Sequence, residues 1–267
     1  MKTLSRRNVS RAAASAVACA FLALATFGAT DVIDIKVVTS GAFTAAFLQL
    51  APKYESETHN KLHTEFGPSM GITHNAIPVR LARGETIDVV IMAEPALDDL
   101  IKQGKVRADS RVELVQSKMA MAVKAGAPHP DISTLEAFKR TLLAAKSIAY
   151  SDSASGVYLS TVLFPKLGVA DQIKAKSKMI PADPVGGVVA SGEFEIGFQQ
   201  VSELRPVKGI DIVGELPPGA QQITMFAAGV PTTSTQPDAA RALIRWLAAP
   251  ALHDVIRKTG LEPVKSR

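Results

Sequence analysis

The stretch IDIKVVTSGAFTAAFLQLAPKYESE, residues 33–57, contains one complete strand–loop–helix unit. Its apolar start, residues 33–38, predicts a strand, and the longer amphipathic segment 42–57 predicts a helix. A loop of small and hydroxyl residues, Thr39 to Thr44, joins the two. Short apolar runs alternate with amphipathic segments along the rest of the chain, and this alternation is typical of an α/β fold.

The same pattern predicts the remaining elements. Further strands are predicted at residues 61–66, 87–92, 119–123, 147–150, 195–198, 210–213 and 222–227. Further helices are predicted at residues 75–83, 94–103, 133–145, 156–167, 184–191, 237–248 and 251–259. The sequence Ser133-Thr134-Leu135-Glu136 predicts a capping box at the start of one of these helices.

The composition restricts the class of protein. The 267 residues carry a net charge of +5, and 47% hydrophobic residues exclude bulk disorder. Four basic residues and no acid lie in residues 1–25, so the rest of the chain has 26 basic against 25 acidic residues, a net charge of +1. This near-neutral charge, with 5% aromatic residues, argues against a nucleic-acid partner. The single Cys excludes a disulfide framework and a Cys-based zinc site.

The first 25 residues have the features of a cleavable export signal. A basic start is followed by an apolar run of residues 12–25, which is too short to span a membrane comfortably. Ala23-Leu24-Ala25 predicts cleavage before Thr26, and Arg6-Arg7 matches a twin-arginine signal, the alternative being a general export leader. Lipidation at Cys19 is not favoured. The sequence therefore predicts a periplasmic location.

No Pro/Gly/Ser-rich tether divides the chain, although it is long enough for two domains. We therefore expect two lobes joined by extended segments near residues 118–125 and 217–225. After the signal peptide at 1–25, lobe 1 comprises 26–118, lobe 2 comprises 119–221, and the chain returns to lobe 1 over 222–267.

Three loops, each after a predicted strand and before a predicted helix, are rich in Ser and Gly. They span residues 39–44, 67–71 and 151–158. Free backbone N–H groups, a helix dipole and hydroxyl donors together favour a small oxyanion or carboxylate. Helix capping and turn formation are the alternative reading of each loop, but three such loops favour a shared ligand cleft.

The mature chain resembles the periplasmic molybdate-binding-protein family of type II solute-binding proteins. The resemblance is carried by residues 37–47, 84–92, 151–158, 186–200 and 240–263, the last reading ARALIRWLAAPALHDVIRKTGLEP. It implies an α/β type II periplasmic binding protein fold, with two lobes around a ligand cleft.

The resemblance also implies ligand positions. The family's second serine matches Ser69, and its third-loop amides match Ser155 and Gly156. Its first serine falls on Ala42 and its tyrosine on Gln200, and both depart from the molybdate pattern. The motifs at residues 67–71, 77–80 and 197–200 are more similar to a branch that includes bacterial aconitate isomerases.

That branch implies a tricarboxylate ligand and an allylic proton shift. A cationic partner is expected for so much negative charge, and Arg80 is the candidate, with Arg83 one turn further on. A proton shift needs a base, and His74 has the most suitable intrinsic pKa. The alternatives are solvated arginines and an exposed loop histidine.

The candidate catalytic residues are therefore His74 and Arg80. The candidate ligand-binding residues are Ser40, Gly41, Ala42, Ser69, Met70, Gly71, Arg80, Ser153, Ser155, Gly156, Val157, Tyr158, Gln199 and Gln200.

Other residue types suggest no further chemistry. Glu94 and Asp152 are read as helix or turn caps. The remaining histidines do not pair with carboxylates at a metal-ligand spacing, and there is no Gly-x-Ser-x-Gly or phosphate-loop motif. No metal and no cofactor are predicted.

Two functions follow from these readings. The first is a periplasmic aconitate isomerase that interconverts trans- and cis-aconitate by cofactor-independent proton transfer. The second is the substrate-binding protein of an ABC importer for molybdate, tungstate or a small carboxylate, with the importer's membrane subunit as partner. In both cases we expect a monomer with a small anionic ligand.

Overall fold

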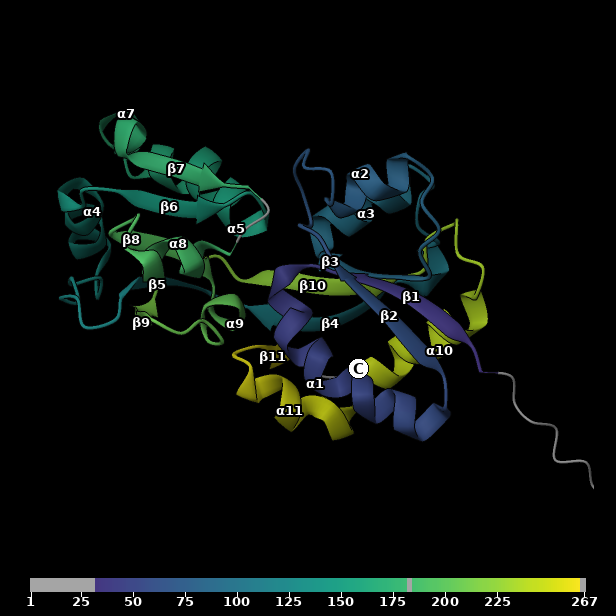
Figure 1. The fold of residues 1–267 in the computed structure, drawn as a ribbon. Coiled ribbons are helices and arrows are strands. Elements are labelled where there is room, and N and C mark those ends of the chain that lie inside the picture. Colours follow the sequence, from purple (N-terminus) through teal and green to yellow (C-terminus); the bar gives the residue numbers. More distant parts are fainter. Residues whose placement is uncertain (1–31, 182–183, 265–267) are drawn as a thin grey trace, which may run out of the picture. The chain divides into compact units, whose positions relative to one another are not determined.

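The computed structural model describes residues 32–181 and 184–264 (Figure 1). The predicted signal peptide and its cleavage site before Thr26 lie outside the described residues. The described chain forms two mixed β-sheets flanked by helices, as the α/β prediction required. Within it, no helix combines the length and the apolar character that a membrane span needs.

The first sheet has the strand order β11-β4-β10-β3-β1-β2, in which β1 is parallel to both β2 and β3 and β10 is antiparallel to β3 and β4. Its strands therefore come from both ends of the chain. They are β1 (Asp34–Thr39), β2 (Lys61–Phe66), β3 (Val89–Ala93), β4 (Val112–Ser117), β10 (Thr224–Gly229) and β11 (Glu262–Pro263). Its helices are α1 (Gly41–Thr58), α2 (Ile77–Ala82), α3 (Glu94–Lys102), α10 (Pro237–Leu247) and α11 (His253–Lys258), with short 3-10 turns at Ala108–Ser110 and Pro250–Leu252.

Successive side chains of β1 pack into two hydrophobic clusters, one on each face of this sheet. Val37 packs into the cluster that contains Phe43 and Phe47 of α1, whereas Val38 packs into the cluster that contains Leu81 of α2 and Leu97 of α3. Successive side chains of a strand point to opposite faces, so α1 covers one face and α2 with α3 covers the other. The carboxyl end of β1 then leads directly into the amino end of α1.

The second sheet has the order β7-β6-β8-β5-β9, with β6 parallel to β7 and β8, and β5 antiparallel to β8 and β9. Its strands are β5 (Met119–Lys124), β6 (Ile148–Ser151), β7 (Ser177–Ile180), β8 (Ile196–Gln200) and β9 (Ile210–Glu215). Its helices are α4 (Leu135–Ala144), α5 (Ala154–Tyr158), α6 (Phe164–Lys166), α7 (Ala170–Ile173), α8 (Val185–Ser191) and α9 (Val201–Leu204), with a π turn at Leu159–Leu163 and a 3-10 turn at Lys174–Lys176.

The chain passes from the first sheet to the second at Lys118, between β4 and β5, and returns between β9 and β10. Gln221, on the returning segment, binds both backbone groups of Met119: its Oε1 accepts from the amide at 3.0 Å, and its Nε2 donates to the carbonyl at 2.9 Å. One amide side chain thus ties the two passages together, because it satisfies a donor and an acceptor at once.

Some predicted elements need correction. The cap of α4 is Thr134, whose hydroxyl accepts from the Ala137 amide at 3.1 Å, whereas the Ser133 hydroxyl donates to Asp131. The helix predicted at 156–167 starts at Ala154 and is interrupted by the π turn. Strands β4, β7 and β11 and helices α7 and α9 were not predicted.

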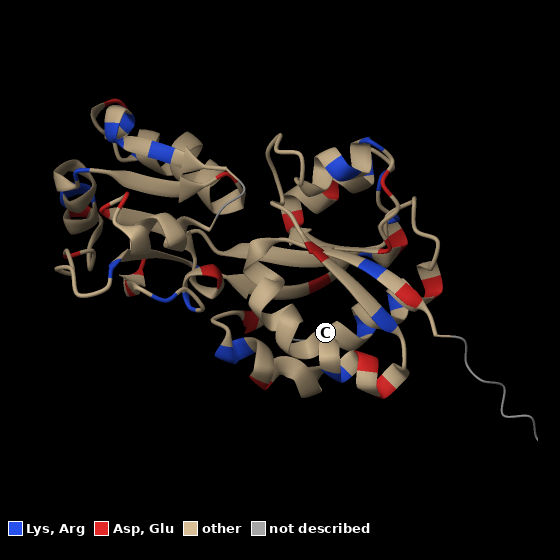
Figure 2. Cartoon of the chain, viewed as in Figure 1, with Lys and Arg blue, Asp and Glu red and all other residues tan. Residues whose placement is uncertain are grey.

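Figure 2 shows acidic and basic residues interspersed over both sheets and their helices. This agrees with the near-neutral charge predicted for the chain without its leader, and any attraction for an anion must come from local groups. In the described residues, no three His, Cys, Asp or Glu side chains are grouped as metal ligands would be.

Candidate functional site

A cavity of about 530 Å³ lies where loops and helix starts of the two sheets meet. It is lined by residues from α1, from the loop after β2, from the loop after β6, and from the end of β8 and α9. These residues are Gly41, Thr44, Ala45, Leu48, Phe66, Gly67, Pro68, Asn75, Ser151, Asp152, Ser153, Pro184, Gln199, Ser202, Glu203, Pro206 and Val207. All three loops that the sequence predicted to bind an anion therefore contribute to one cavity.

A smaller hollow adjoins this cavity and shares three of its residues. It is lined by Ser40, Gly41, Ala42, Ser153, Ala154, Ser155, Gln200, Glu203 and Phe226. The starts of α1 and α5 both lie in this wall, and the first amide groups of a helix have no acceptor within the helix. The hollow therefore offers backbone donors to a small anionic group.

The amino end of α1 carries a buried hydroxyl that is free to bind a ligand. Ser40 is the N-cap residue, but its side chain does not cap the helix, and its buried Oγ has no hydrogen-bond partner in the described structure. Buried polar atoms without partners are uncommon and call for an explanation. A ligand oxygen in the adjoining hollow would supply the missing partner.

The loop after β2 is positioned by Ser69, which is fully buried. Its Oγ accepts from the Ala93 amide at 2.9 Å, and its own amide donates to Ser153 Oγ at 3.2 Å. Ser69 therefore connects the second loop to the end of β3 and to the third loop. Its neighbour Met70 packs against the core under α2 and α3, and Gly71 lies beside the backbone of Asp152. The structure places none of these three in the cavity wall.

The third loop turns tightly into α5. A Cβ at Gly156 would lie 1.6 Å from the Ser151 carbonyl oxygen, so only glycine fits. The hydroxyls of Ser151 and Ser155 are 2.9 Å apart. Neither Val157 nor Tyr158 lines the cavity: Val157 is exposed, and Tyr158 donates its hydroxyl to the Ala220 carbonyl at 3.2 Å. Burial raises the pKa of Tyr158.

Two glutamines end β8 in different environments. Gln199 Oε1 accepts from the Val185 amide at 3.1 Å, and its Nε2 donates to Glu203 Oε1 at 3.0 Å. Gln200 donates to Thr224 Oγ1 at 3.3 Å, while its buried Oε1 has no partner in the described structure. Gln199 thus lines the cavity and orients a carboxyl group, and Gln200 faces the hollow.

Glu203 lines both the cavity and the hollow. Burial raises its pKa to about 7, and the negative charge of Asp152 acts in the same direction, whereas hydrogen bonds from Gln199 and the Gln200 backbone act against it. A carboxyl group with this pKa exists in both protonation states near neutral pH. Sequence reasoning missed Glu203; its only signal was an acid that follows two glutamines a few residues after the strand predicted at 195–198.

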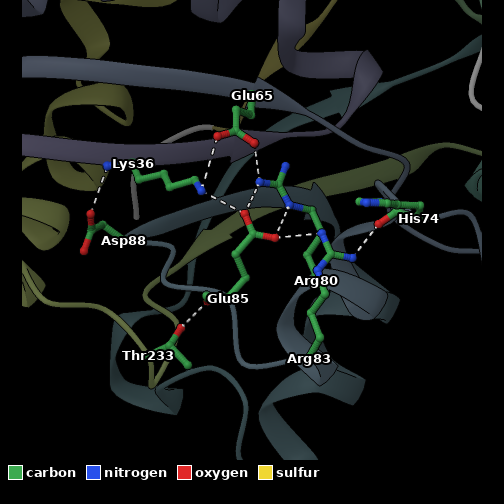
Figure 3. Close-up of polar contacts among 8 residues, drawn as sticks. All are labelled: Lys36, Glu65, His74, Arg80, Arg83, Glu85, Asp88 and Thr233. Atoms are coloured by element: carbon green, nitrogen blue, oxygen red, sulfur yellow. Dashed lines mark hydrogen bonds and ion pairs between the residues drawn. The ribbon is translucent and has the colours of Figure 1, made fainter.

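Arg80 lies elsewhere, in a network of charged groups (Figure 3). Its buried guanidinium binds Glu65 and Glu85, with Nε 3.0 Å from Glu85 Oε2, and Lys36 binds the same two carboxylates. Hydrogen bonds from Arg80 hold the pKa of Glu85 far below its usual range. The donors that Arg80 was predicted to offer a ligand are therefore occupied by protein carboxylates.

His74 is exposed, and its backbone carbonyl accepts from Arg83 Nη1 at 2.6 Å (Figure 3). Its neighbour Asn75 lines the cavity, but His74 does not. The described residues that line the cavity include two acids, Asp152 and Glu203, and no Lys or Arg. A bound anion would therefore be held by neutral donors.

Comparison with known proteins gives one family and two relatives. The family described as bacterial extracellular solute-binding protein matches residues 35–262. The chain is 51% identical over 239 residues to an aconitate isomerase of Pseudomonas sp., covering 90% of this chain and 91% of that protein. It is 26% identical to the molybdate-binding protein ModA of Azotobacter vinelandii, covering 87% and 91% of the two chains.

Solved structures with the same fold include two oxyanion-binding proteins. The periplasmic molybdate-binding protein of Azotobacter vinelandii aligns with a TM-score of 0.68 at 21% identity, covering 87% of this chain and 100% of that one. The sulfate-binding protein SubI of Mycobacterium tuberculosis aligns with a TM-score of 0.68 at 19% identity, covering 87% and 88%. These likenesses confirm the type II binding-protein fold that the sequence predicted.

Proposed function

This chain belongs to the bacterial extracellular solute-binding protein family, and from that premise we propose that it is an aconitate isomerase. The observation that carries the proposal is the 51% identity to an aconitate isomerase over nine-tenths of the chain. The cavity supports it, because anion-binding donors and a titratable carboxyl group line the same wall. The fold alone would not separate an enzyme from a receptor.

The reaction moves one proton and one double bond. A base removes a proton from the methylene carbon, whose electrons then form the new double bond towards the central carbon. The former vinyl carbon takes up a proton, so trans-aconitate becomes cis-aconitate with no change in oxidation state. The chemistry needs a base, donors that stabilise the developing negative charge, and no cofactor.

The substrate carboxylates would bind at the small hollow and the adjoining cavity wall. The amino end of α1 supplies backbone donors, and Ser40 supplies a hydroxyl without another partner. Ser153, Ser155 and Gly156 supply the donors of the third loop, and Gln200 supplies a buried amide. Ser69 holds the loops in place. This assignment does not use Arg80 or His74, which lie outside the wall.

The second candidate is a receptor for molybdate or another small anion, delivered to an ABC importer. The 26% identity to ModA and the hydroxyl and amide donors around the hollow favour it. A receptor needs no titratable carboxyl group in its cavity, so Glu203 favours the enzyme.

Membership in a family of extracellular solute-binding proteins supports a location outside the cytoplasm. We propose that residues 1–25 direct it to the periplasm and that it acts there as a monomer. We also propose that the two sheets are the cores of two lobes, formed by residues 32–118 with 222–264 and by residues 119–221.

The test is conversion of trans-aconitate by the purified protein, followed by chromatography of the cis isomer, alongside a molybdate titration by calorimetry. Conversion to an equilibrium mixture, with no heat from molybdate, is the expected result. Tight molybdate binding without conversion would contradict the isomerase and establish the receptor.

A further inference from the structure

Glu203 and Asp152 are the titratable groups of the cavity wall in the described structure. Glu203 lies in α9, directly after β8, and α9 packs against α1. Its Oε1 would be 1.9 Å from a Cβ at Gly41, so the carboxyl group lies against the backbone of the first residue of α1. Gln199 Nε2 holds the same oxygen at 3.0 Å. The carboxyl group is therefore fixed at the point where cavity and hollow join.

We propose that Glu203 is the base that carries the proton between the two carbons of aconitate. The proposal rests on the isomerase function and names the catalytic residue of that site. The carboxylate takes a proton from the methylene carbon, and the released electron pair spreads over the allylic carbons and the adjacent substrate carboxylate. The resulting carboxylic acid returns the proton to the former vinyl carbon. The enzyme ends in its starting state, so the step balances without another reactant.

The surroundings of Glu203 suit this cycle. Burial and Asp152 raise its pKa to about 7, which keeps both the accepting and the donating form available at neutral pH. The first turn of α1 and all of α8 carry no charged residue. Two cations lie on elements near Glu203. Arg205, which follows α9, donates to the Lys258 carbonyl, and Lys124, at the end of β5, lies beside Gly192. Neither cation lines the cavity, so Asp152 is the charged group that faces Glu203 there.

The substitution Glu203→Gln keeps the shape of the side chain and an oxygen for Gln199 to donate to, but cannot take a proton. We expect kcat for trans-aconitate to fall about 10²–10⁴-fold, as for other lost general bases. Binding of trans-aconitate by calorimetry should change little. The limb of the wild-type rate profile near pH 7 should disappear.

Two further variants keep the test decisive. Glu203→Asp retains a titratable carboxyl group on a shorter side chain and should recover part of the rate. Glu193→Gln is the matched control, at an exposed glutamate between α8 and β8 whose Oε1 lies 4.0 Å from Lys178 Nζ, and it should keep wild-type kinetics.

The outcomes separate the two proposals. Conversion by wild type and equally by a folded Glu203→Gln protein overturns the role of Glu203 and leaves the isomerase intact. A wild-type protein that does not convert trans-aconitate overturns both. If Glu203→Gln loses both trans-aconitate binding and activity, then Glu203 is a binding residue, and the proposal is also overturned.

Discussion

Gly41, the first residue of α1, lies against the carboxyl group of Glu203, the proposed base. A Cβ there meets the end of the Glu203 side chain, not backbone, and that end can move. Gly41→Ala is therefore expected to fold with a change in the free energy of unfolding of no more than about 1 kcal/mol. The displaced carboxyl group should lower kcat by about tenfold to a hundredfold, because misplacement by about an ångström can cost that much.

Gly187→Ala provides the control for Gly41→Ala. Gly187 lies in α8, where a Cβ would have no neighbour within 4 Å. This variant should keep the wild-type rate, measured in the same trans-aconitate assay. Equal rates for Gly41→Ala, Gly187→Ala and wild type would show that the position of Glu203 against α1 does not matter for turnover.

The raised pKa of Glu203 also makes a prediction about stability. The folded protein holds a proton on Glu203 up to about pH 7, whereas the unfolded chain releases it near pH 4.5. The folded state therefore binds more protons in this range, and the free energy of unfolding falls as the pH rises from 4.5 through about 7. Glu203→Gln lacks this contribution. Urea unfolding of both proteins across the range should show a difference that changes with pH; a constant difference would contradict the shifted pKa.

Individual site residues were predictable to different degrees. The position of Ser40 and Ser153 beside a cavity could be predicted, because a Ser-rich loop between strand and helix has a known preference for anions. Glu203 could not, because nothing local shows whether an acid on a helix of four residues faces solvent or a cavity. Arg80 was assigned to a ligand because its partners Glu65 and Glu85 come from other segments, which only the fold brings together.

At the level of elements, the sequence predicted the strands whose apolar runs are continuous, such as β3, in which all residues are buried. It missed β4, in which Glu113 and Gln116 interrupt the apolar pattern, although pairing with β10 and β11 makes it an inner strand. It also missed β7, an edge strand with two exposed residues. Such strands form because they pair with segments that are distant in the sequence, and this pairing cannot be read from a single sequence.

The charged network around Arg80 connects three segments of the first sheet and its helices, so we expect it to stabilise the fold and not to bind the substrate. Arg80 belongs to α2, Glu65 to β2, and Glu85 precedes β3, while the Arg80 side chain is only 5% exposed. Arg80→Met removes the buried partner of two carboxylates that keep Lys36 as a second partner, and it should lower the free energy of unfolding by about 1–3 kcal/mol. The KM for trans-aconitate should stay within about threefold of wild type, because Arg80 does not line the cavity and its loss would remove no contact with the substrate.

Lys102→Met is the control for Arg80→Met. Lys102 forms an exposed pair with Asp99, three residues earlier on α3, at 3.2 Å. Exposed pairs contribute about 0–1 kcal/mol, so this variant should unfold close to wild type in urea. If Arg80→Met instead raises KM strongly and leaves stability unchanged, then Arg80 contacts the substrate after all.

For the whole molecule, charge and ligand choice are linked. Without its leader the chain carries a net charge of +1, its charges are interspersed, and the described cavity wall has no Lys or Arg. Long-range attraction of an anion is then weak, and recognition depends on the number of neutral donors that the wall can direct at each oxygen. In the proposed site, a planar tricarboxylate would use donors of the hollow and of the cavity wall at once, whereas a smaller tetrahedral oxyanion would reach fewer of them.

Ligand-linked stability tests this difference on the intact protein. Trans-aconitate at about a hundred times its Kd should raise the free energy of unfolding by about 2.7 kcal/mol. For a chain of this length, that corresponds to a rise in Tm of roughly 5–10 °C. Glu203→Gln should show the same rise, because the donors that hold the carboxylates remain. Propane-1,2,3-tricarboxylate, which has the same carboxylates but no double bond to move, should raise Tm without being converted. Molybdate should leave Tm unchanged, and a molybdate-induced rise that exceeds the one from trans-aconitate would reverse the order of the two proposed functions.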